Sequence, residues 1–182
     1  MDNDIKPALL IIDMINDFDF EQGEILSRKA AEITTPIVNL KQQFQEKNLP
    51  VVYINDHFDL WKADIDKIIE YCTNDLSREV IARISPGKDD YFLIKPKHSA
   101  FYETALHTLL QQLGVNTLIL AGVAGNICVL FTANDAYMRE YKLYIPEDCV
   151  ASNSHEDNEY ALAMMREVLS ANTDPSAKIF DR

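Results

Sequence analysis

The sequence predicts an α/β fold, a three-layer α/β/α sandwich with a mainly parallel, Rossmann-like sheet of five or six strands. Five short apolar runs show no alternation in polarity, which is typical of strands that are covered on both faces. Longer segments with helical periodicity separate these runs, and helices that connect parallel strands cover both faces of a sheet. No repeat, low-complexity tract or flexible linker divides the 182 residues, so we expect one domain over residues 1–182.

The strands are predicted where apolar residues follow one another without a break. The first run is Ala-Leu-Leu-Ile-Ile and the fourth is Thr-Leu-Ile-Leu-Ala, and neither contains a charged residue. Residues 86–90, with Pro86 and Gly87, form a turn before the third run. In chain order, the predicted strands cover residues 8–12, 51–54, 91–94, 117–121 and 142–145.

The helices are predicted in the segments between and after the strands. The second should break around residues 73–75, where Asp75 can cap a new helix. The last is amphipathic, with Leu162 and Met165 set against acidic residues, as in a helix that covers a core or an interface. The tail after Leu169 holds a short edge strand or none. The predicted helices cover residues 28–47, 62–83, 102–113, 126–140 and 154–169.

The charge balance excludes several classes of partner. Seventeen Lys and Arg residues against 29 Asp and Glu residues give a net charge of −12, which repels nucleic acid and anionic membranes. No apolar run reaches the roughly 18 residues of a membrane span, and residues 1–4 are acidic where a signal peptide is positively charged. We therefore expect a cytoplasmic protein that binds neither nucleic acid nor membrane. The three cysteines, Cys72, Cys128 and Cys149, are odd in number and widely spread, which indicates neither a disulfide framework nor a paired metal site.

Polar residues follow the predicted strands at the edge where ligands bind in open α/β sheets. Asp13 ends the first strand and Lys95 ends the third. The fourth strand leads into the segment from Gly122 to Cys128, in which two glycines bracket a tight turn into the next helix. Because the carboxyl ends of parallel strands meet at one edge, an acid, a base and a thiol can converge there. Asn55, Asp56 and His57 follow the second strand, and Glu147 and Asp148 follow the fifth.

These three residues form a plausible nucleophilic set. Cys128 lies in the first turn of a helix, where free N–H groups and the helix dipole stabilise a thiolate and can hold an oxyanion. A positive charge on Lys95 lowers the pKa of a nearby thiol, and Asp13 can take the thiol proton and return it to a leaving nitrogen. Each residue also has a structural interpretation: Cys128 as a small buried hydrophobe, Asp13 as a turn cap and Lys95 as a surface charge. Their convergence favours catalysis.

Three ordered motifs lie at residues 10–18, 95–101 and 122–129, and residues 132–136 on the following predicted helix accompany them. These segments resemble the isochorismatase-like cysteine hydrolases, a superfamily that includes nicotinamidases, N-carbamoylsarcosine amidase and ureidoacrylate amidohydrolase. The resemblance extends over nearly the whole chain.

The resemblance implies a role for each residue of the set. It makes Cys128 the nucleophile, Asp13 the general acid and base, and Lys95 the residue that supports the thiolate. It also implies a non-proline cis peptide between Val123 and Ala124, with the N–H groups of Ala124 and Cys128 as the oxyanion hole. The reaction that it implies is hydrolysis of a small-molecule amide, carbamoyl or ureido C–N bond through a thioester. By resemblance we also expect a homo-oligomer, a dimer or tetramer.

The sequence departs from the family pattern at two places. Ile15 replaces a common Gln in the first motif and leaves Asp13 untouched. Nicotinamidases bind a metal through Asp-x-His after the second strand, whereas this chain has Asp56, His57 and Phe58, so the His is displaced by one residue. The four histidines include no convincing ligand pair. We therefore expect no required metal and no cofactor.

Aromatic residues in the loops after the first three strands suggest a planar or partly apolar small-molecule substrate. The predicted substrate-binding residues are Phe18, Trp61, His98 and Phe101, although Phe18 and Phe101 can equally be core residues.

Two alternative functions stay open. One is hydrolysis of an ether by an isochorismatase-type enzyme, which the thiol disfavours because true isochorismatases lack it. The other is a non-catalytic α/β module for binding or assembly, which the intact Asp13, Lys95 and Cys128 disfavour.

Overall fold

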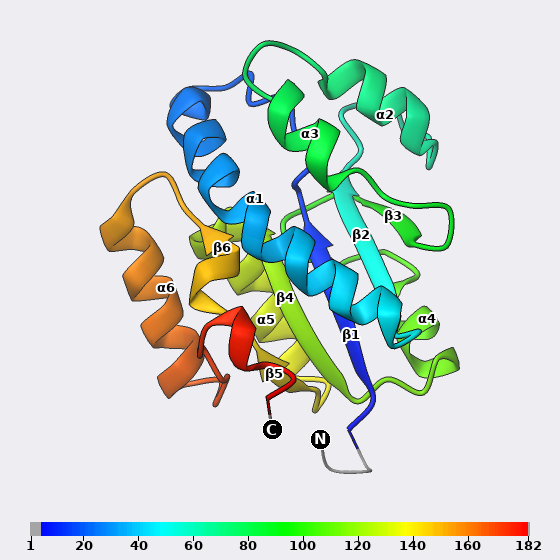
Figure 1. The fold of residues 1–182 in the computed structure, drawn as a ribbon, viewed down its shortest axis with the longest axis vertical. Coiled ribbons are helices and arrows are strands. Elements are labelled where there is room, and N and C mark those ends of the chain that lie inside the picture. Colours follow the sequence, from blue (N-terminus) through cyan, green and yellow to red (C-terminus); the bar gives the residue numbers. More distant parts are fainter. Residues whose placement is uncertain (1–4, 182) are drawn as a thin grey trace.

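A six-stranded parallel sheet runs through the middle of the molecule (Figure 1). The structure is a computed structural model and describes residues 5–181. Arg182 and residues 1–4 lie outside the described residues, and the expectation about a signal peptide rests on residues 1–4. Neighbouring strands follow the order β3-β2-β1-β4-β5, and β6 pairs with the carboxyl end of β4. The strands are β1 (Pro7–Ile12), β2 (Val51–Asp56), β3 (Tyr91–Lys95), β4 (Thr117–Val123), β5 (Lys142–Tyr144) and β6 (Val150–Ala151).

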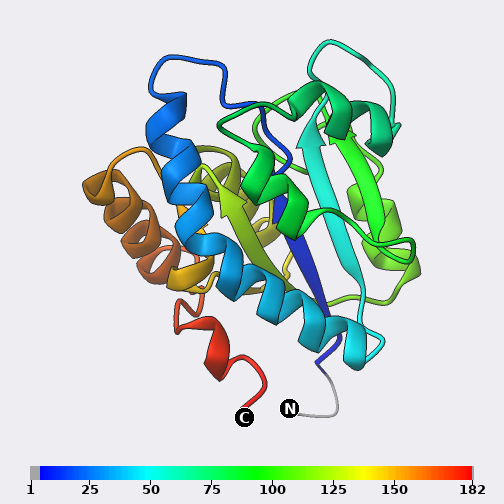
Figure 2. The same ribbon diagram turned by 45° about the horizontal axis from the view of Figure 1, so that its top comes forward.

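Helices cover both faces of this sheet, which confirms the predicted three-layer α/β/α sandwich (Figures 1 and 2). Side chains of α1, α2 and α3 pack on one face, and side chains of α4, α5 and α6 pack on the other. Along β1, Leu9 and Ile11 point to the first face, whereas Leu10 and Ile12 point to the second. The helices are α1 (Gly23–Glu46), α2 (Ile65–Cys72), α3 (Arg78–Ile84), α4 (Leu106–Gln112), α5 (Leu130–Tyr137) and α6 (His155–Glu167).

Several predicted boundaries are corrected. Helix α1 begins five residues before the predicted start at residue 28, and α4 begins four residues after residue 102. The break near residues 73–75 is confirmed, but the N-cap residue of the new helix is Ser77 and not Asp75. The Asn74 Oδ1 accepts the N–H groups of Leu76 and Ser77 at 2.8 and 3.2 Å, which organises the turn before α3. In place of an edge strand, the described tail has an isolated bridge between Asn172 and Tyr144 and a short 3-10 helix, η3 (Ser176–Lys178).

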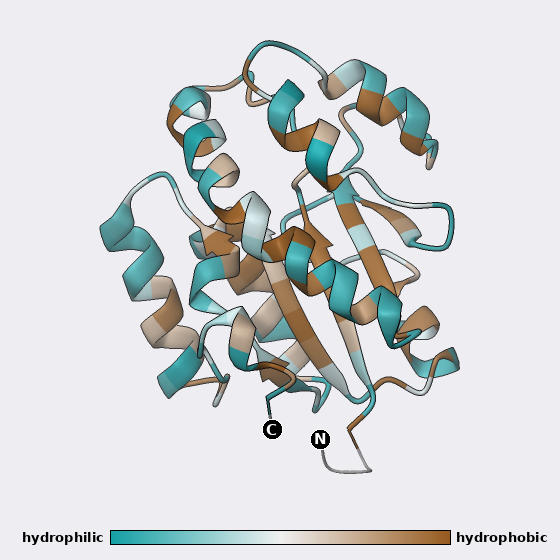
Figure 3. Cartoon of the chain, in the orientation of Figure 1, coloured by the Kyte–Doolittle hydropathy of each residue, from teal (hydrophilic) through white to brown (hydrophobic). Residues whose placement is uncertain are grey.

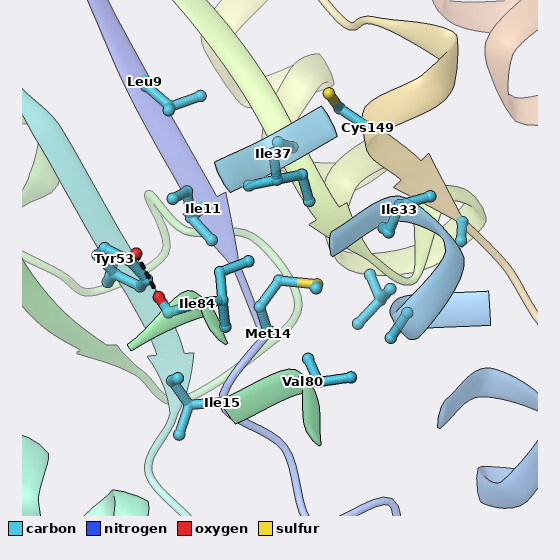
Figure 4. Close-up of a cluster of buried hydrophobic side chains, with 14 of the residues drawn as sticks. Leu9, Ile11, Met14, Ile15, Ile33, Ile37, Tyr53, Val80, Ile84 and Cys149 are labelled. Atoms are coloured by element: carbon cyan, nitrogen blue, oxygen red, sulfur yellow. Dashed lines mark hydrogen bonds between the residues drawn. The ribbon is translucent and has the colours of Figure 1, made fainter. Parts of the chain in front are cut away.

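The core under α1 is apolar and fully enclosed. The strands are the most apolar part of the chain, and the helices turn their polar sides outward (Figure 3). Figure 4 shows one buried cluster to which β1 contributes Leu9 and Ile11, α1 contributes Ile33 and Ile37, and α3 contributes Val80 and Ile84. None of the helices within residues 5–181 combines the length and apolar character that a membrane span requires.

A buried ion pair lies beside this core. The Lys41 Nζ lies 2.7 Å from Asp90 Oδ2 and donates to the Tyr53 hydroxyl at 2.9 Å. The Tyr53 hydroxyl in turn donates to the Ile84 carbonyl at 2.5 Å (Figure 4). Burial and the Asp90 carboxylate both raise the pKa of Tyr53 far above its ordinary value, so its hydroxyl keeps its proton. Each charge has a partner, which is how buried ionic groups are tolerated.

Strand β1 pairs with β2 on one side, and the chain later returns to place β4 on the other side of β1. The carboxyl ends of β1 and β4 therefore border the crevice at which open α/β sheets bind ligands. Gly122 is required here, because a Cβ at this position would lie 2.0 Å from the Ile12 carbonyl oxygen. Its φ of 120° also disfavours any other residue.

Candidate active site

Asp13, Lys95 and Cys128 meet at the carboxyl edge of the sheet, which is tilted forward in Figure 2. Asp13 follows β1, Lys95 is the last residue of β3, and Cys128 lies in a short π-helix, η1 (Gly125–Val129), directly after β4. The Lys95 Nζ lies 2.8 Å from Asp13 Oδ2 and 3.6 Å from Cys128 Sγ. The structure therefore brings together the three residues that the strand ends predict.

Asp13 is held in place by its backbone and by its carboxylate. Its φ of 51° lies in the left-handed region, which turns the chain away from β1. The Asp13 N–H donates to the Ile54 carbonyl at 3.0 Å, and Asp13 Oδ1 accepts the Asp56 N–H at 2.9 Å. Because Oδ2 contacts Lys95, both carboxylate oxygens have partners and the orientation of the acid is fixed.

The turn that carries Cys128 is fastened on two sides. The peptide bond between Val123 and Ala124 is cis, as the resemblance implies. A Cβ on Gly125 would lie 2.5 Å from the Asn158 side-chain oxygen of α6, so any other residue would have to displace that side chain. The Asn126 N–H donates to Ser152 Oγ at 3.0 Å, which ties η1 to the chain beyond β6.

The segment after Lys95 docks on the helix that follows Cys128. Ser99 Oγ donates to Asp135 Oδ2 at 2.5 Å, and the Ala100 N–H donates to Thr132 Oγ1 at 3.0 Å. The Thr132 hydroxyl also donates to the Cys128 carbonyl at 2.7 Å. These contacts join the segments 95–101 and 132–136 and hold the lysine and the cysteine in register.

Burial controls the protonation of the thiol. Burial raises the pKa of Cys128 well above its ordinary value, and the Asp13 carboxylate raises it further. The Lys95 ammonium lowers it but does not outweigh these two effects. The pKa of Lys95 is itself raised: burial lowers it, but the Asp13 carboxylate favours the ammonium through its charge and its hydrogen bond. The predicted effect of Lys95 is thus present, but on balance the pKa of Cys128 stays above its ordinary value, which favours the thiol over the thiolate in the free protein.

A pocket of about 340 Å³ opens above the three residues. Its wall combines carboxylates, amides and apolar side chains from the loops after β1, β2, β4 and β6. A space of this size suits a small molecule. Asp13, Lys95, Ala124 and Cys128 share the lining with Asn16, Asp17, Phe20, Leu26, Asp56, Phe58, His98, Val123, Ile127 and Asn153.

Comparison with known proteins now identifies the family. The model of the isochorismatase domain matches residues 7–174. The chain belongs to the isochorismatase family. It is 57% identical over 175 residues to the isochorismatase family protein YaaI of Bacillus subtilis, which covers 96% of this chain and 97% of YaaI.

Two solved structures, one named as an amidase and one as a nicotinamidase, share the fold over nearly their full length. The N-carbamoylsarcosine amidase from Thermoplasma acidophilum superposes with a TM-score of 0.75 at 32% identity, covering 97% of this chain and 99% of that one. The nicotinamidase PncA from Bacillus subtilis gives a TM-score of 0.74 at 30% identity, covering 93% and 100%. The family resemblance of the motifs is thereby confirmed.

Only one of the four predicted substrate-binding residues lines the pocket of this isochorismatase-family protein. His98 does, with its Nδ1 3.9 Å from Cys128 Sγ. Phe18 is 1% exposed because its backbone turns the ring into the core under α1. Phe101 is buried on the opposite face against Tyr141. Trp61 is 65% exposed outside the pocket.

The sequence interpretation missed several lining residues. Asn16 and Asp17 belong to the first motif and could have been found by extending the strand-end rule a few residues beyond Asp13. Leu26 lies on α1, which begins earlier than predicted. Asn153 follows β6, and a strand of two residues leaves no periodic signal.

The residues after β2 do not fit the metal site of nicotinamidases. The His57 ring stacks on Trp61 with centroids 4.0 Å apart, and its Nδ1 accepts the Asp59 N–H at 3.0 Å. Phe58 occupies the pocket wall instead. Across residues 5–181, no group of three or more His, Cys, Asp or Glu residues has the arrangement of a metal site.

Proposed function

We propose that this protein hydrolyses an amide, carbamoyl or ureido C–N bond of a small molecule, with Cys128 as the nucleophile. The observation that carries the proposal is the chain of contacts from Asp13 through Lys95 to Cys128 at the floor of the pocket. Similarity to structures named as an amidase and a nicotinamidase supports the same reaction class.

The first step moves a proton from sulfur to carboxylate. Cys128 begins as a thiol, so the proton leaves only when a carbonyl carbon is in position for attack. We propose that Asp13 accepts this proton while the sulfur attacks and the C=O electrons move to oxygen. The Lys95 ammonium, 3.6 Å from the sulfur, stabilises the negative charge that develops there. The N–H groups of Ala124 and Cys128 are the proposed donors to the oxyanion.

The second step breaks the C–N bond and frees the enzyme. When the oxyanion reforms the carbonyl, the nitrogen leaves with the proton that Asp13 carries, and a thioester on Cys128 remains. A water molecule then gives a proton to Asp13 and adds to the thioester. Collapse of this intermediate expels the sulfur, which regains the proton from Asp13, and releases the acid product. Asp13 therefore acts twice as base and twice as acid.

Ammonia release tests the proposal directly. A panel of small primary amides and carbamoyl compounds is incubated with wild type, Cys128→Ala, Asp13→Asn and the control Cys149→Ala. Cys149 is a buried thiol outside the pocket, so its removal controls for loss of a sulfur. We expect release by wild type and the control only. Release by Cys128→Ala at the wild-type rate would refute the nucleophile, and release from no compound would favour an ether substrate or a binding role.

We also propose that the protein acts in the cytoplasm. All three cysteines, at positions 72, 128 and 149, are free thiols, which suits a reducing compartment. A nucleophilic thiol would also be protected there from oxidation to a disulfide.

A further inference from the structure

The pocket around Cys128 carries an excess of negative charge. Among the described residues that line it, three are aspartates, Asp13, Asp17 and Asp56, and one is a lysine, Lys95. Three carboxylates and one ammonium leave a charge of −2 when the His98 ring is neutral. The Lys95 ammonium already forms an ion pair with Asp13, since its Nζ lies 2.8 Å from the Asp13 carboxylate.

The other two carboxylates have only backbone partners from their own turns. Asp17 Oδ1 accepts the Asp19 N–H at 3.1 Å, and Asp56 Oδ1 accepts the Phe58 N–H at 2.9 Å. Neither forms an ion pair with a Lys, Arg or His side chain of residues 5–181. The negative charge of each carboxylate is therefore available to a positively charged group of a bound molecule.

Their combined field acts on a group outside the pocket. Cys72, the last residue of α2, is fully buried in the core. Burial raises the pKa of this thiol to about 12, and Asp17, Asp56 and Asp13 all contribute to the increase. The three carboxylates thus act in the same direction on one neighbour, as a local negative potential does.

The rest of the lining offers no compensation for an anion. Asn16 and Asn153 are neutral amides, and Phe20, Leu26 and Phe58 are apolar. A carboxylate on a ligand would face Asp17 and Asp56 without a free cation nearby. An ammonium or another group rich in N–H donors would find acceptors instead.

We propose that the substrate is an amide or ureido compound without an anionic group, which presents an ammonium or similar N–H-rich group to Asp17 and Asp56. The inference rests on the proposed function, because it names the substrate class of the same pocket. The two carboxylates select charge, and the triad of Asp13, Lys95 and Cys128 performs the hydrolysis.

Three carboxamides of similar length test the selection. 3-Aminopropanamide is cationic, butanamide is neutral and succinamate is anionic, and ammonia release gives kcat/KM for each. We expect the cationic amide to exceed the anionic amide by at least about tenfold, equivalent to about 1.4 kcal/mol. Asp17→Asn should reduce this ratio, whereas Asp19→Asn, an exposed carboxylate outside the lining, should leave it unchanged. A preference for succinamate would overturn the proposal.

A second measurement does not depend on activity. Methanethiosulfonates with a trimethylammonium or a sulfonate end react with Cys128 to form a mixed disulfide and release a sulfinate. The ratio of their rates, divided by the ratio for free cysteine, reports the charge of the pocket. We expect the cationic reagent to be favoured about tenfold or more, and less so in Asp17→Asn than in Asp19→Asn. A ratio near that of free cysteine would overturn the charge selection, even if amides are hydrolysed; a large ratio without hydrolysis would instead refute the proposed function alone.

Discussion

Replacing Lys95 with methionine should slow the alkylation of Cys128. The thiolate is the form that reacts with iodoacetamide, and Cys128 is mostly thiol because burial and Asp13 raise its pKa. The ammonium 3.6 Å away opposes both effects. Without it, the thiolate fraction at a given pH falls, and the labelling rate falls in proportion.

The contact distance sets the size of this effect. At 3.6 Å, two unit charges interact by about 1.2 kcal/mol with the screening of water and by about 4.6 kcal/mol at an effective dielectric constant of roughly 20. The smaller value already corresponds to about a sevenfold change in the thiolate fraction, since about 1.4 kcal/mol is a factor of ten. We therefore expect labelling at pH 8 to slow by at least about sevenfold.

The assay is mass spectrometry of the peptide that contains Cys128, with time points in iodoacetamide at pH 8. Asp13→Asn is the informative counterpart, because removal of the carboxylate should speed labelling while activity is lost. Each single variant leaves one buried charge without its partner, at a cost of about 3–5 kcal/mol in folding stability, so circular dichroism must show native protein in both. If the folded Lys95→Met protein is labelled at Cys128 as fast as the wild type, the electrostatic reasoning is refuted.

Three further outcomes are expected. Gly122→Ala should lower the free energy of unfolding by about 2–4 kcal/mol in urea denaturation, whereas Gly87→Ala, whose added Cβ would have no atom closer than 3.5 Å, should change it by less than about 0.5 kcal/mol. Asp90→Ala should cost about 3–5 kcal/mol by leaving Lys41 buried without its carboxylate, yet ammonia release per folded molecule should stay at the wild-type level. Chelator treatment should leave activity unchanged. A loss of activity that zinc or iron restores would contradict the expectation that the segment after β2, with its displaced His57, holds no required metal.

The convergence of the three candidate catalytic residues could be predicted from the sequence because topology alone brings them together. Asp13 and Lys95 end buried strands, and Cys128 follows the turn after a third strand. In a parallel sheet, all three must lie at the same edge, whatever the details of the loops. The motifs of the family then add the cis peptide, which no property of Val123 or Ala124 indicates by itself.

The substrate side of the pocket could not be predicted in the same way. The left-handed backbone at Phe18, with φ of 55°, turns its ring into the core, and neither periodicity nor composition reports such a turn. Asn153 reaches the pocket through a strand too short to recognise. The protonation of Cys128 depends on how deeply the sulfur is buried relative to Asp13 and Lys95, and only the packed structure contains that balance.

The ion pair between Asp13 and Lys95 bridges a whole strand, because β2 lies between β1 and the edge strand β3. The proposed activity therefore requires that β3 stays paired with β2. If β3 detaches at elevated temperature, Lys95 leaves the sulfur while the helices and the other strands remain folded. Enzymatic inactivation should then precede the loss of the helical circular dichroism signal, and on refolding, activity should be the last native property to return.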